Sequence, residues 1–147
     1  MKVSVILKKK GSGEVATIAP DRPVSDAVGL LSEHRIGALV VSANGRNVDG
    51  ILSERDIVGR LGAEGASMMN HKIEDLMTAN VETCIGDDTA FDLLGRMTEG
   101  RFRHMPVLGS DGAMIGILSI GDVVKARLEE IESENAAMAD MLSGEVF

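Results

Sequence analysis

The stretch GILSERD at residues 50–56 returns as GILSIGD at residues 116–122, and this repetition decides how the chain is organised. When the sequence is shifted by 66 residues, Thr17–Val58 lies over Thr83–Val124 without a gap and shares thirteen identical pairs. Average amino-acid usage would give about two or three identities over such a span. Two copies are too few for an open solenoid, so the chain is predicted to be a pseudo-symmetric pair.

Each copy has the same predicted order of elements, β-α-β-β-α. The first helix of copy one has apolar residues at positions 24, 27, 28 and 31, the spacing of a helix with one buried face. Asn44-Gly45 and Asp111-Gly112 favour hairpins because these residues tolerate positive φ. The predicted strands are residues 15–19, 38–42 and 48–53 in copy one and 81–85, 105–108 and 113–119 in copy two. The sequence therefore predicts an α/β (α+β) fold in which two such motifs pack as one module, followed by a C-terminal helix.

Three segments lie outside the repeat. Val3–Lys10 is predicted to be a short helix that ends at Gly11. Residues 62–70, rich in Gly, Ala, Ser and Met, are predicted to be a connection, and residues 73–77 one helical turn. The predicted boundaries are 12–63 for motif 1, 64–78 for the linker, 79–127 for motif 2 and 128–147 for the C-terminal helix extension.

Composition narrows the classes of function. The formal net charge of −8 would repel nucleic acid, and a chain without Trp or Tyr lacks the stacking platforms of single-strand binders. No apolar run approaches the roughly 20 residues of a membrane-spanning helix, and no secretory signal is recognisable. A cytoplasmic protein without nucleic-acid or membrane partners is therefore predicted. Cys84 is the only cysteine, so neither an internal disulfide nor a metal cluster is expected.

The Ser-x-x-Asp part of each repeated string allows two interpretations. Ser53 and Ser119 each stand where a strand meets a helix, with Asp56 and Asp122 three residues on. The structural interpretation is a helix N-cap, since Ser-x-x-Asp is close to a capping box. The functional interpretation is a ligand site, because a helix N-terminus attracts phosphate and a carboxylate suits the two hydroxyls of a ribose. Both hold at once if the capped helix also binds a ligand.

A cationic cluster, Arg101, Arg103 and His104, precedes a strand of copy two. Either these side chains offset the dipole of the preceding helix, or they clamp a phosphate through the planar donor fork of arginine. Copy one has the smaller and less charged stretch Ile36-Gly37-Ala38 near this position, and Arg55 on the following helix adds a cation.

The gapless repeat, the two Gly-h-h-Ser-x-x-Asp strings (h, hydrophobic), the hairpins and Leu76-Met77-Thr78 before copy two together strongly resemble a pair of cystathionine-β-synthase (CBS) domains, a Bateman module. The resemblance covers roughly residues 12–127 and is to small stand-alone bacterial CBS-pair proteins. It implies two motifs packed about a pseudo-twofold axis, with clefts between them for adenosine-containing ligands. AMP is the first expectation, and ADP, ATP and NAD(H) are the others.

The resemblance also implies residue roles. Asp56 or Asp122 would hold the ribose hydroxyls, Ser53 or Ser119 would face the phosphate, and the cationic cluster would neutralise it. The implied ligand-binding residues are Thr17, Ile18, Ile36, Gly37, Ala38, Ser53, Arg55, Asp56, Thr83, Cys84, Arg101, Arg103, His104, Met105, Pro106, Ser119 and Asp122. Because Ile120 and Gly121 replace Glu54 and Arg55, the region beside the second string is expected to be the more apolar and compact.

No catalytic residue is predicted. An enzyme needs an activated nucleophile or a paired acid and base. Cys84 lies in an apolar strand, and a phosphate contact explains His104 as well as catalysis does. The resemblance therefore implies a regulatory module that senses an adenosine ligand and passes its state to an unknown downstream protein. The alternative is a ligand-free dimeric adaptor.

The segment after Asp122 is predicted to be helical to about Leu142. Its apolar residues at positions 124, 128, 131, 138 and 142, together with Asn135, have the 4-3-4-3-4 spacing of a coiled-coil seam. Either this helix lies on its own domain with one face buried, or it contributes to a homodimer. The resemblance favours the homodimer, because paired CBS modules usually form disc-like dimers.

Overall fold

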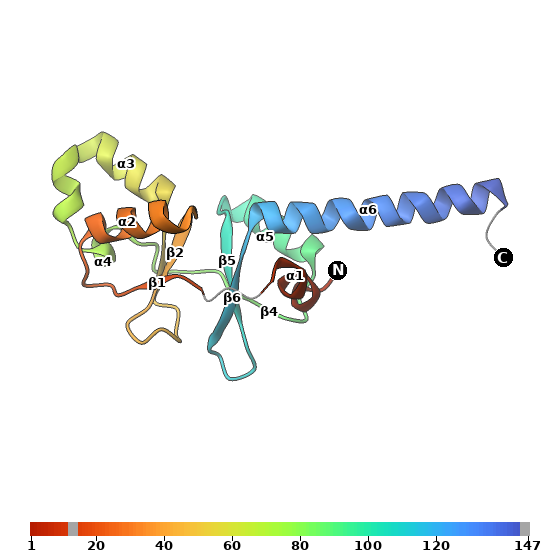
Figure 1. Cartoon of the computed structure of the whole chain (residues 1–147), viewed down its shortest axis with the longest axis horizontal. Coiled ribbons are helices and arrows are strands. Elements are labelled where there is room, and N and C mark those ends of the chain that lie inside the picture. Colours follow the sequence, from red (N-terminus) through yellow and green to blue (C-terminus); the bar gives the residue numbers. More distant parts are fainter. Residues whose placement is uncertain (12–14, 145–147) are drawn as a thin grey trace.

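Each copy of the repeat forms a small three-stranded sheet with helices packed on it (Figure 1). In the computed structural model, which describes residues 1–11 and 15–144, the first half comprises β1 (Thr17–Ile18), α2 (Val24–His34), β2 (Ala38–Val41), β3 (Gly50–Ser53) and α3 (Glu54–Glu64). The second half comprises β4 (Cys84–Ile85), α5 (Ala90–Gly100), β5 (His104–Leu108), β6 (Met114–Ser119) and α6 (Ile120–Ser143). The predicted α/β fold of two β-α-β-β-α motifs and a C-terminal helix is confirmed. The first residues of predicted motif 1, 12–14, and the last of the predicted extension, 145–147, lie outside the described residues.

The two sheets have the same topology. The middle strand, β2 or β5, runs parallel to the first strand and antiparallel to the third. Ala38 pairs with Ser53 in the first sheet, and His104 pairs with Ser119 at the equivalent position of the second. This register places the start of each middle strand beside the serine that begins the following helix, which is the position where the candidate site residues cluster.

The strands at the edges are shorter than the sequence predicted. β1 and β4 each have two residues, where the expected strands were 15–19 and 81–85, because only Thr17–Ile18 and Cys84–Ile85 pair with a middle strand. The hairpins follow the turn signals, and Gly45 and Gly112 take positive φ of 76° and 80°.

The core of the second half is completed by a segment from the start of the chain. The predicted N-terminal helix is α1 (Val3–Lys10), which ends at Gly11. Its Val3 and Ile6 are buried among apolar residues of the second half, which run from Cys84 to Ala126. The helix that precedes the first half in sequence therefore packs on the second half in space.

The core of the first half receives the reciprocal contribution. Met68, Ile73 and Leu76 lie in its apolar cluster and are nearly inaccessible to solvent. They belong to η1 (Ala66–Asn70), a short 3-10 helix inside the predicted connection, and to α4 (Ile73–Leu76), the predicted helical turn. The segment predicted to be a linker is thus part of the first core.

The glycine that opens each repeated string lets these exchanged segments approach the sheet. A Cβ atom at Gly50 would lie 2.6 Å from Met77 Sδ and 2.9 Å from the carbonyl oxygen of Thr78. A Cβ atom at Gly116 would lie 2.7 Å from Leu7 Cδ2. The same position is therefore occupied by glycine in both halves for the same reason, a close crossing of the segment from the other side.

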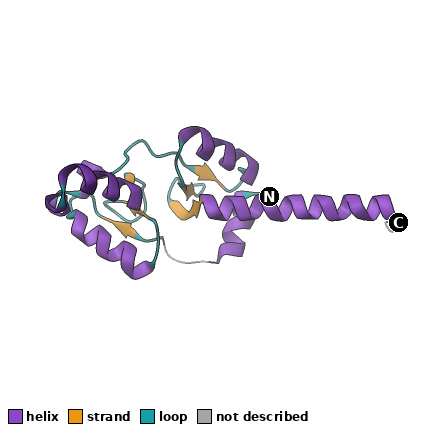
Figure 2. Cartoon of the chain, turned by 90° about the horizontal axis from the view of Figure 1, so that it is seen from above, coloured by secondary structure: helices purple, strands orange, loops and turns teal. Residues whose placement is uncertain are grey.

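The long helix α6 begins in the second core and then leaves the body of the molecule (Figures 1 and 2). Val123 and Ala126 are buried, whereas every residue from 131 to 143 is exposed. The predicted helix to about Leu142 is confirmed. The interpretation that it lies on its own domain is wrong for the part beyond residue 130. Within residues 1–11 and 15–144, no helix is both long and apolar enough to cross a membrane.

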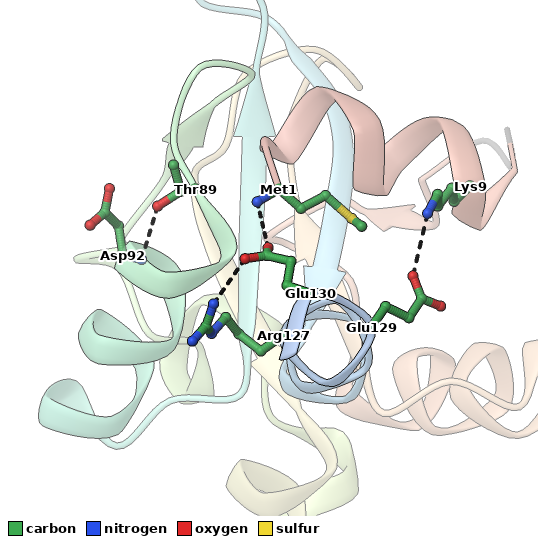
Figure 3. A network of polar contacts seen from close by, with 7 residues as sticks. All are labelled: Met1, Lys9, Thr89, Asp92, Arg127, Glu129 and Glu130. Carbon is green, nitrogen blue, oxygen red and sulfur yellow. Dashed lines mark hydrogen bonds and ion pairs between the residues drawn. The ribbon is translucent and has the colours of Figure 1, made fainter. Parts of the chain in front are cut away.

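Ion pairs connect the N-terminal segment, including α1, to α6 (Figure 3). Lys9 Nζ lies 3.4 Å from Glu129 Oε2, and the amino group of Met1 contacts Glu130 (Figure 3). Lys10 Nζ lies 2.9 Å from Asp122 Oδ2 in the first turn of α6. These contacts and the buried face of α1 together fix the helix on the second half.

Candidate functional site

Two clefts take their walls from both copies of the repeat. Cleft 1 has a volume of about 1060 Å³ and joins the start of β2, at Ile36–Ala38, to Ser119 at the start of α6. Cleft 2 has a volume of about 610 Å³ and joins Ser53–Asp56 at the start of α3 to Arg101–His104 at the start of β5. In each cleft the serine of one repeated string faces the middle-strand entrance of the opposite copy.

Cleft 2 gathers the predicted arginines. Arg55, Arg101 and Arg103 line it, together with the carboxylates of Asp56 and Glu54. A concentration of guanidinium groups is a local exception in a chain of net charge −8. Such groups bind phosphate through paired donors, so cleft 2 offers an anion site next to a carboxylate.

Cleft 1 contains predicted residues from the first half and unpredicted ones from α1. Thr17, Ile36, Gly37 and Ala38 line it, as does Ser119 from the second half. These five come from the set that the sequence predicted.

The cations of cleft 1 come from outside the repeat. Lys8 and Lys10 of α1 line the cleft. The expectation that the region beside Ile120 and Gly121 would be the compact, apolar one therefore differs from the structure, because cleft 1 is the larger and carries lysines. The reason is that α1 has no second copy in the repeat, so comparison of the two strings could not place it there.

Both Ser-x-x-Asp strings form complete capping boxes, as the structural interpretation predicted. The N–H of Asp56 donates to Ser53 Oγ at 3.3 Å, and the N–H of Ser53 donates to Asp56 Oδ2 at 2.9 Å. Ser119 and Asp122 make the same pair of bonds at 3.2 and 2.9 Å. In both strings Oδ2 supports the cap, and Oδ1 accepts no hydrogen bond from any described residue. The cap therefore leaves one carboxylate oxygen for a further donor, and the two interpretations are compatible.

Gly37 and His104 form a wall that the two clefts share, since both residues line both clefts. A Cβ atom at Gly37 would lie 3.5 Å from His104 Cε1 and 3.4 Å from Glu54 Oε1. Because Gly37 has no side chain, little separates the two clefts at this point, and groups in one cleft lie close to groups in the other.

The ionisable groups at the wall are shifted by burial and by Lys10. Burial lowers the pKa of His104, and the nearby charge of Lys10 lowers it further, while Glu54 and Asp122 oppose these effects. Burial alone would raise the pKa of Asp122, but the hydrogen bonds from Lys10 and from Ser119 outweigh it, so the pKa of Asp122 is lowered. Asp122 is therefore an anion already neutralised by a lysine of α1.

The remaining residues of the predicted set line neither cleft: Ile18, Thr83, Cys84, Met105, Pro106 and Asp122. Four of them are buried in the sheets: Ile18, Cys84, Met105 and Pro106. Burial raises the pKa of Cys84 to about 12, which keeps its thiol protonated. The carbonyl oxygen of Thr83 accepts a hydrogen bond from Arg96 at 2.7 Å.

Sequence reasoning missed the residues just before the first strand of each copy. Val15 lines cleft 1, and Asn80 and Val81 line cleft 2. The repeat itself carried this signal, since Val15 and Val81 are 66 residues apart. Among residues 1–11 and 15–144, no group of three or more His, Cys, Asp or Glu side chains is arranged to hold a metal ion.

The sequence profile of the CBS domain matches residues 11–63 and 73–129, which are the two halves of this structure. The chain belongs to the CBS domain family. A CBS-domain containing protein from Agrobacterium tumefaciens is 42% identical, and its crystal structure matches with a TM-score of 0.81 over 86% of this chain and 99% of that chain. The CBS domain-containing protein CBSX3, mitochondrial, of Arabidopsis thaliana is 35% identical over 139 residues, which are 90% of this chain and 67% of the plant protein.

A more distant CBS domain protein, from Pyrobaculum aerophilum, was solved in complex with AMP. It is 19% identical and has a TM-score of 0.73 over 83% of this chain and 89% of that chain, so it shares the CBS fold. Several other Arabidopsis thaliana relatives are much longer, and this chain spans only 23% to 26% of their length.

Proposed function

We propose that this CBS-domain protein is a regulatory module that binds adenosine-containing ligands in the clefts between its two motifs, with AMP as the first candidate. The observation that carries this proposal is that cleft 2 is lined by residues of both motifs. Ser53 and Asp56 of the first motif lie on one wall, and Arg101 and Arg103 of the second lie on the other. A nucleotide that bridges the two walls would hold the motifs together.

The chemistry of cleft 2 fits a ribose phosphate. Asp56 keeps one carboxylate oxygen outside its capping box, and a carboxylate oxygen accepts from a ribose hydroxyl. The arginine forks suit a phosphate. The volumes of the clefts, about 610 and 1060 Å³, compare with about 300–1000 Å³ for sites of small ligands. The AMP complex of the protein from Pyrobaculum aerophilum adds support, and ADP, ATP and NAD(H) are further candidates.

The proposed role is binding and not catalysis. Cys84 is buried, and its raised pKa leaves it without a reactive thiolate. His104 has no nucleophile among the described residues with which it shares a hydrogen bond. The signal would be a change in how firmly the two motifs are joined, passed to a downstream protein.

The assembly we propose is a homodimer to which α6 contributes. The apolar side chains at its predicted seam are exposed on the single chain, with Leu128 at 54% and Ile131 at 39%. A second copy of α6 would cover them. Light scattering on the full chain should show a dimer, and Ile131→Lys should weaken it, whereas a monomer at micromolar concentration would contradict this assembly.

Binding of AMP and of adenosine, measured by calorimetry, tests the ligand proposal. AMP should raise the melting temperature of the parent chain. Arg103→Ala should weaken AMP about 10- to 100-fold and adenosine little, because a hydrogen bond to a charged group contributes about 1.5–3 kcal/mol. Equal weakening of both ligands would contradict the phosphate role. If no adenosine ligand binds, the chain is better explained as a ligand-free dimeric adaptor.

A spectroscopic check is inexpensive. The chain has no Trp or Tyr and therefore absorbs little at 280 nm. A peak at 260 nm in the purified protein would reveal a nucleotide that copurifies.

A further inference from the structure

The charge of cleft 1 differs from that of the protein as a whole. The described residues that line it include two lysines and two histidines and no Asp or Glu. In a chain of net charge −8, such a lining is a local excess of positive charge. Cleft 2, in contrast, mixes three arginines with the carboxylates of Glu54, Asp56 and Glu82.

We infer that Lys8 and Lys10 of α1 form a phosphate-binding subsite in cleft 1, so that this cleft selects nucleotides over nucleosides. The inference rests on the proposed function. In the repeat, Gly37 stands where Arg103 stands in copy two, and it has no side chain with which to hold a phosphate. The lysines of α1 supply the charge that the first copy lacks at this position.

The position of Lys10 supports this role. Its Nζ donates to Asp122 Oδ2 and to the carbonyl oxygen of Ile117, both at 2.9 Å. An ammonium group has three donors, so one is left for a ligand. Its side chain is 39% exposed, and it lies on the cleft wall near Ser119, the serine expected to face a phosphate.

The helix that carries these lysines is held in place. Val3 and Ile6 of α1 are buried in the second core, and Leu7 packs on Gly116 of β6. A lysine on an anchored helix loses less freedom when it binds than one on a loop. Lys9, between the two, points elsewhere and lies 3.4 Å from Glu129 on α6.

Charge balance favours an anionic ligand at this subsite. Lys10 already neutralises Asp122, and burial together with Lys10 lowers the pKa of His104, so His104 adds little charge near neutral pH. A neutral nucleoside would leave Lys8 without a counterion in the cleft. A phosphate would accept from Lys8 and from the remaining donor of Lys10, beside Ser119 on the cleft wall.

The experiment uses the full chain with cleft 2 weakened by Asp56→Asn and Arg103→Gln, so that cleft 1 dominates binding. Titration calorimetry then measures AMP and adenosine. Adding Lys8→Gln and Lys10→Gln should weaken AMP at least about tenfold and adenosine by less than about twofold. Lys9→Gln is the matched control and should change neither ligand. Lys8→Arg with Lys10→Arg should restore most of the AMP affinity, because the charge returns.

The outcomes separate this inference from the proposed function. One outcome is that AMP binds in this background while Lys8→Gln with Lys10→Gln weakens AMP and adenosine equally or leaves both affinities unchanged. In that case the lysine subsite is wrong and the proposed function stands. If the parent chain binds neither ligand, both are wrong. Circular dichroism of each variant, compared with that of Lys9→Gln, shows whether α1 remains in place.

Discussion

Cleft 1 and cleft 2 carry the same Gly-Ile-Leu-Ser string and the same capping box, yet they differ in size and in charge. Cleft 2 draws its cations from the strand entrance of the second motif, at Arg101 and Arg103, and from Arg55 of α3. Cleft 1 has a glycine at the equivalent position and takes lysines from α1. The comparison teaches that the repeated string supplies the framework of both clefts, whereas in cleft 1 a segment outside the repeat supplies the lysines.

The crossing segments themselves differ. The flexible side chain of Leu7 lies over Gly116, and it belongs to α1, which carries three lysines at its end. Over Gly50 pass Met77 and the backbone of Thr78, in an extended segment. The fold is thus symmetric in its strands and helices and asymmetric in what approaches each cleft.

The largest effect expected is on stabilisation by ligand. At a hundredfold excess over Kd, one bound AMP should add about 2.7 kcal/mol, or roughly 5–10 °C in Tm. Asp56→Asn should remove more of this shift than Asp122→Asn, because Asp56 lines cleft 2, whereas Asp122 lines neither cleft and is already paired with Lys10. Thermal melts with and without AMP measure both variants.

The same melts without ligand provide the control. Loss of either carboxylate from its capping box should cost about 0.5–2 kcal/mol at most, since asparagine keeps one acceptor oxygen. Equal losses of the AMP shift would make the two aspartates equivalent. If neither substitution reduced it, both would be helix caps only.

A smaller effect is expected from the crossing segments. Gly50→Ala should destabilise the chain by about 1–3 kcal/mol, because its Cβ would meet the Thr78 carbonyl oxygen. That backbone cannot move freely, since it exchanges hydrogen bonds of 3.0 and 2.9 Å with Ile51. Gly116→Ala should cost less than about 1 kcal/mol, because Leu7 can change rotamer. Urea unfolding measures both, and equal costs would contradict the difference between the two crossings.

The smallest effect expected is at the shared wall. The lowered pKa of His104 means that the unfolded chain binds a proton more readily than the native chain does. Stability should therefore fall as the pH drops below about 6.5, the ordinary pKa of histidine. His104→Gln should make the decline shallower.

Anionic ligands should act on the same titration. Lys10, Glu54, Asp122 and Arg103 all contribute to the electrostatics at His104, and a phosphate in either cleft would favour its protonated form. Unfolding measured from pH 7.5 to 5.5, with and without AMP, should show a shallower decline when AMP is bound. A slope that neither His104→Gln nor AMP changes would remove His104 as a link between the clefts.

The repeated framework could be predicted from the sequence because its signals are local. The apolar spacing of α2, the glycines of the hairpins and the Ser-x-x-Asp caps each act within a few residues. The serines of the clefts followed from the repeated strings, and Arg101 and Arg103 followed from the cationic cluster before a strand. Such signals state where an element lies and which residues begin it.

The rest depended on contacts between distant parts of the chain. Nothing within α1 indicates that it packs on the second half, or that Lys8 and Lys10 reach cleft 1. The sequence also did not show which residues of the short first strands face a cleft: Thr17 lines a cleft, whereas its neighbour Ile18 is buried. A two-residue strand has too little pattern to show which side is which.

The packing of α1 on the second half affects the order in which parts of the chain fold. During synthesis α1 is made before its partners, which run from Cys84 to Ala126. A helix of eight residues is too short to be stable alone in water, so it must wait unformed while the first half, whose core ends at Leu76, already folds. Cleft 2 needs the folded second half, because His104 pairs with Ser119 of β6, whereas cleft 1 needs the docking of α1 as well. The two clefts are therefore expected to become competent for binding one after the other, with cleft 1 formed by the last step of folding.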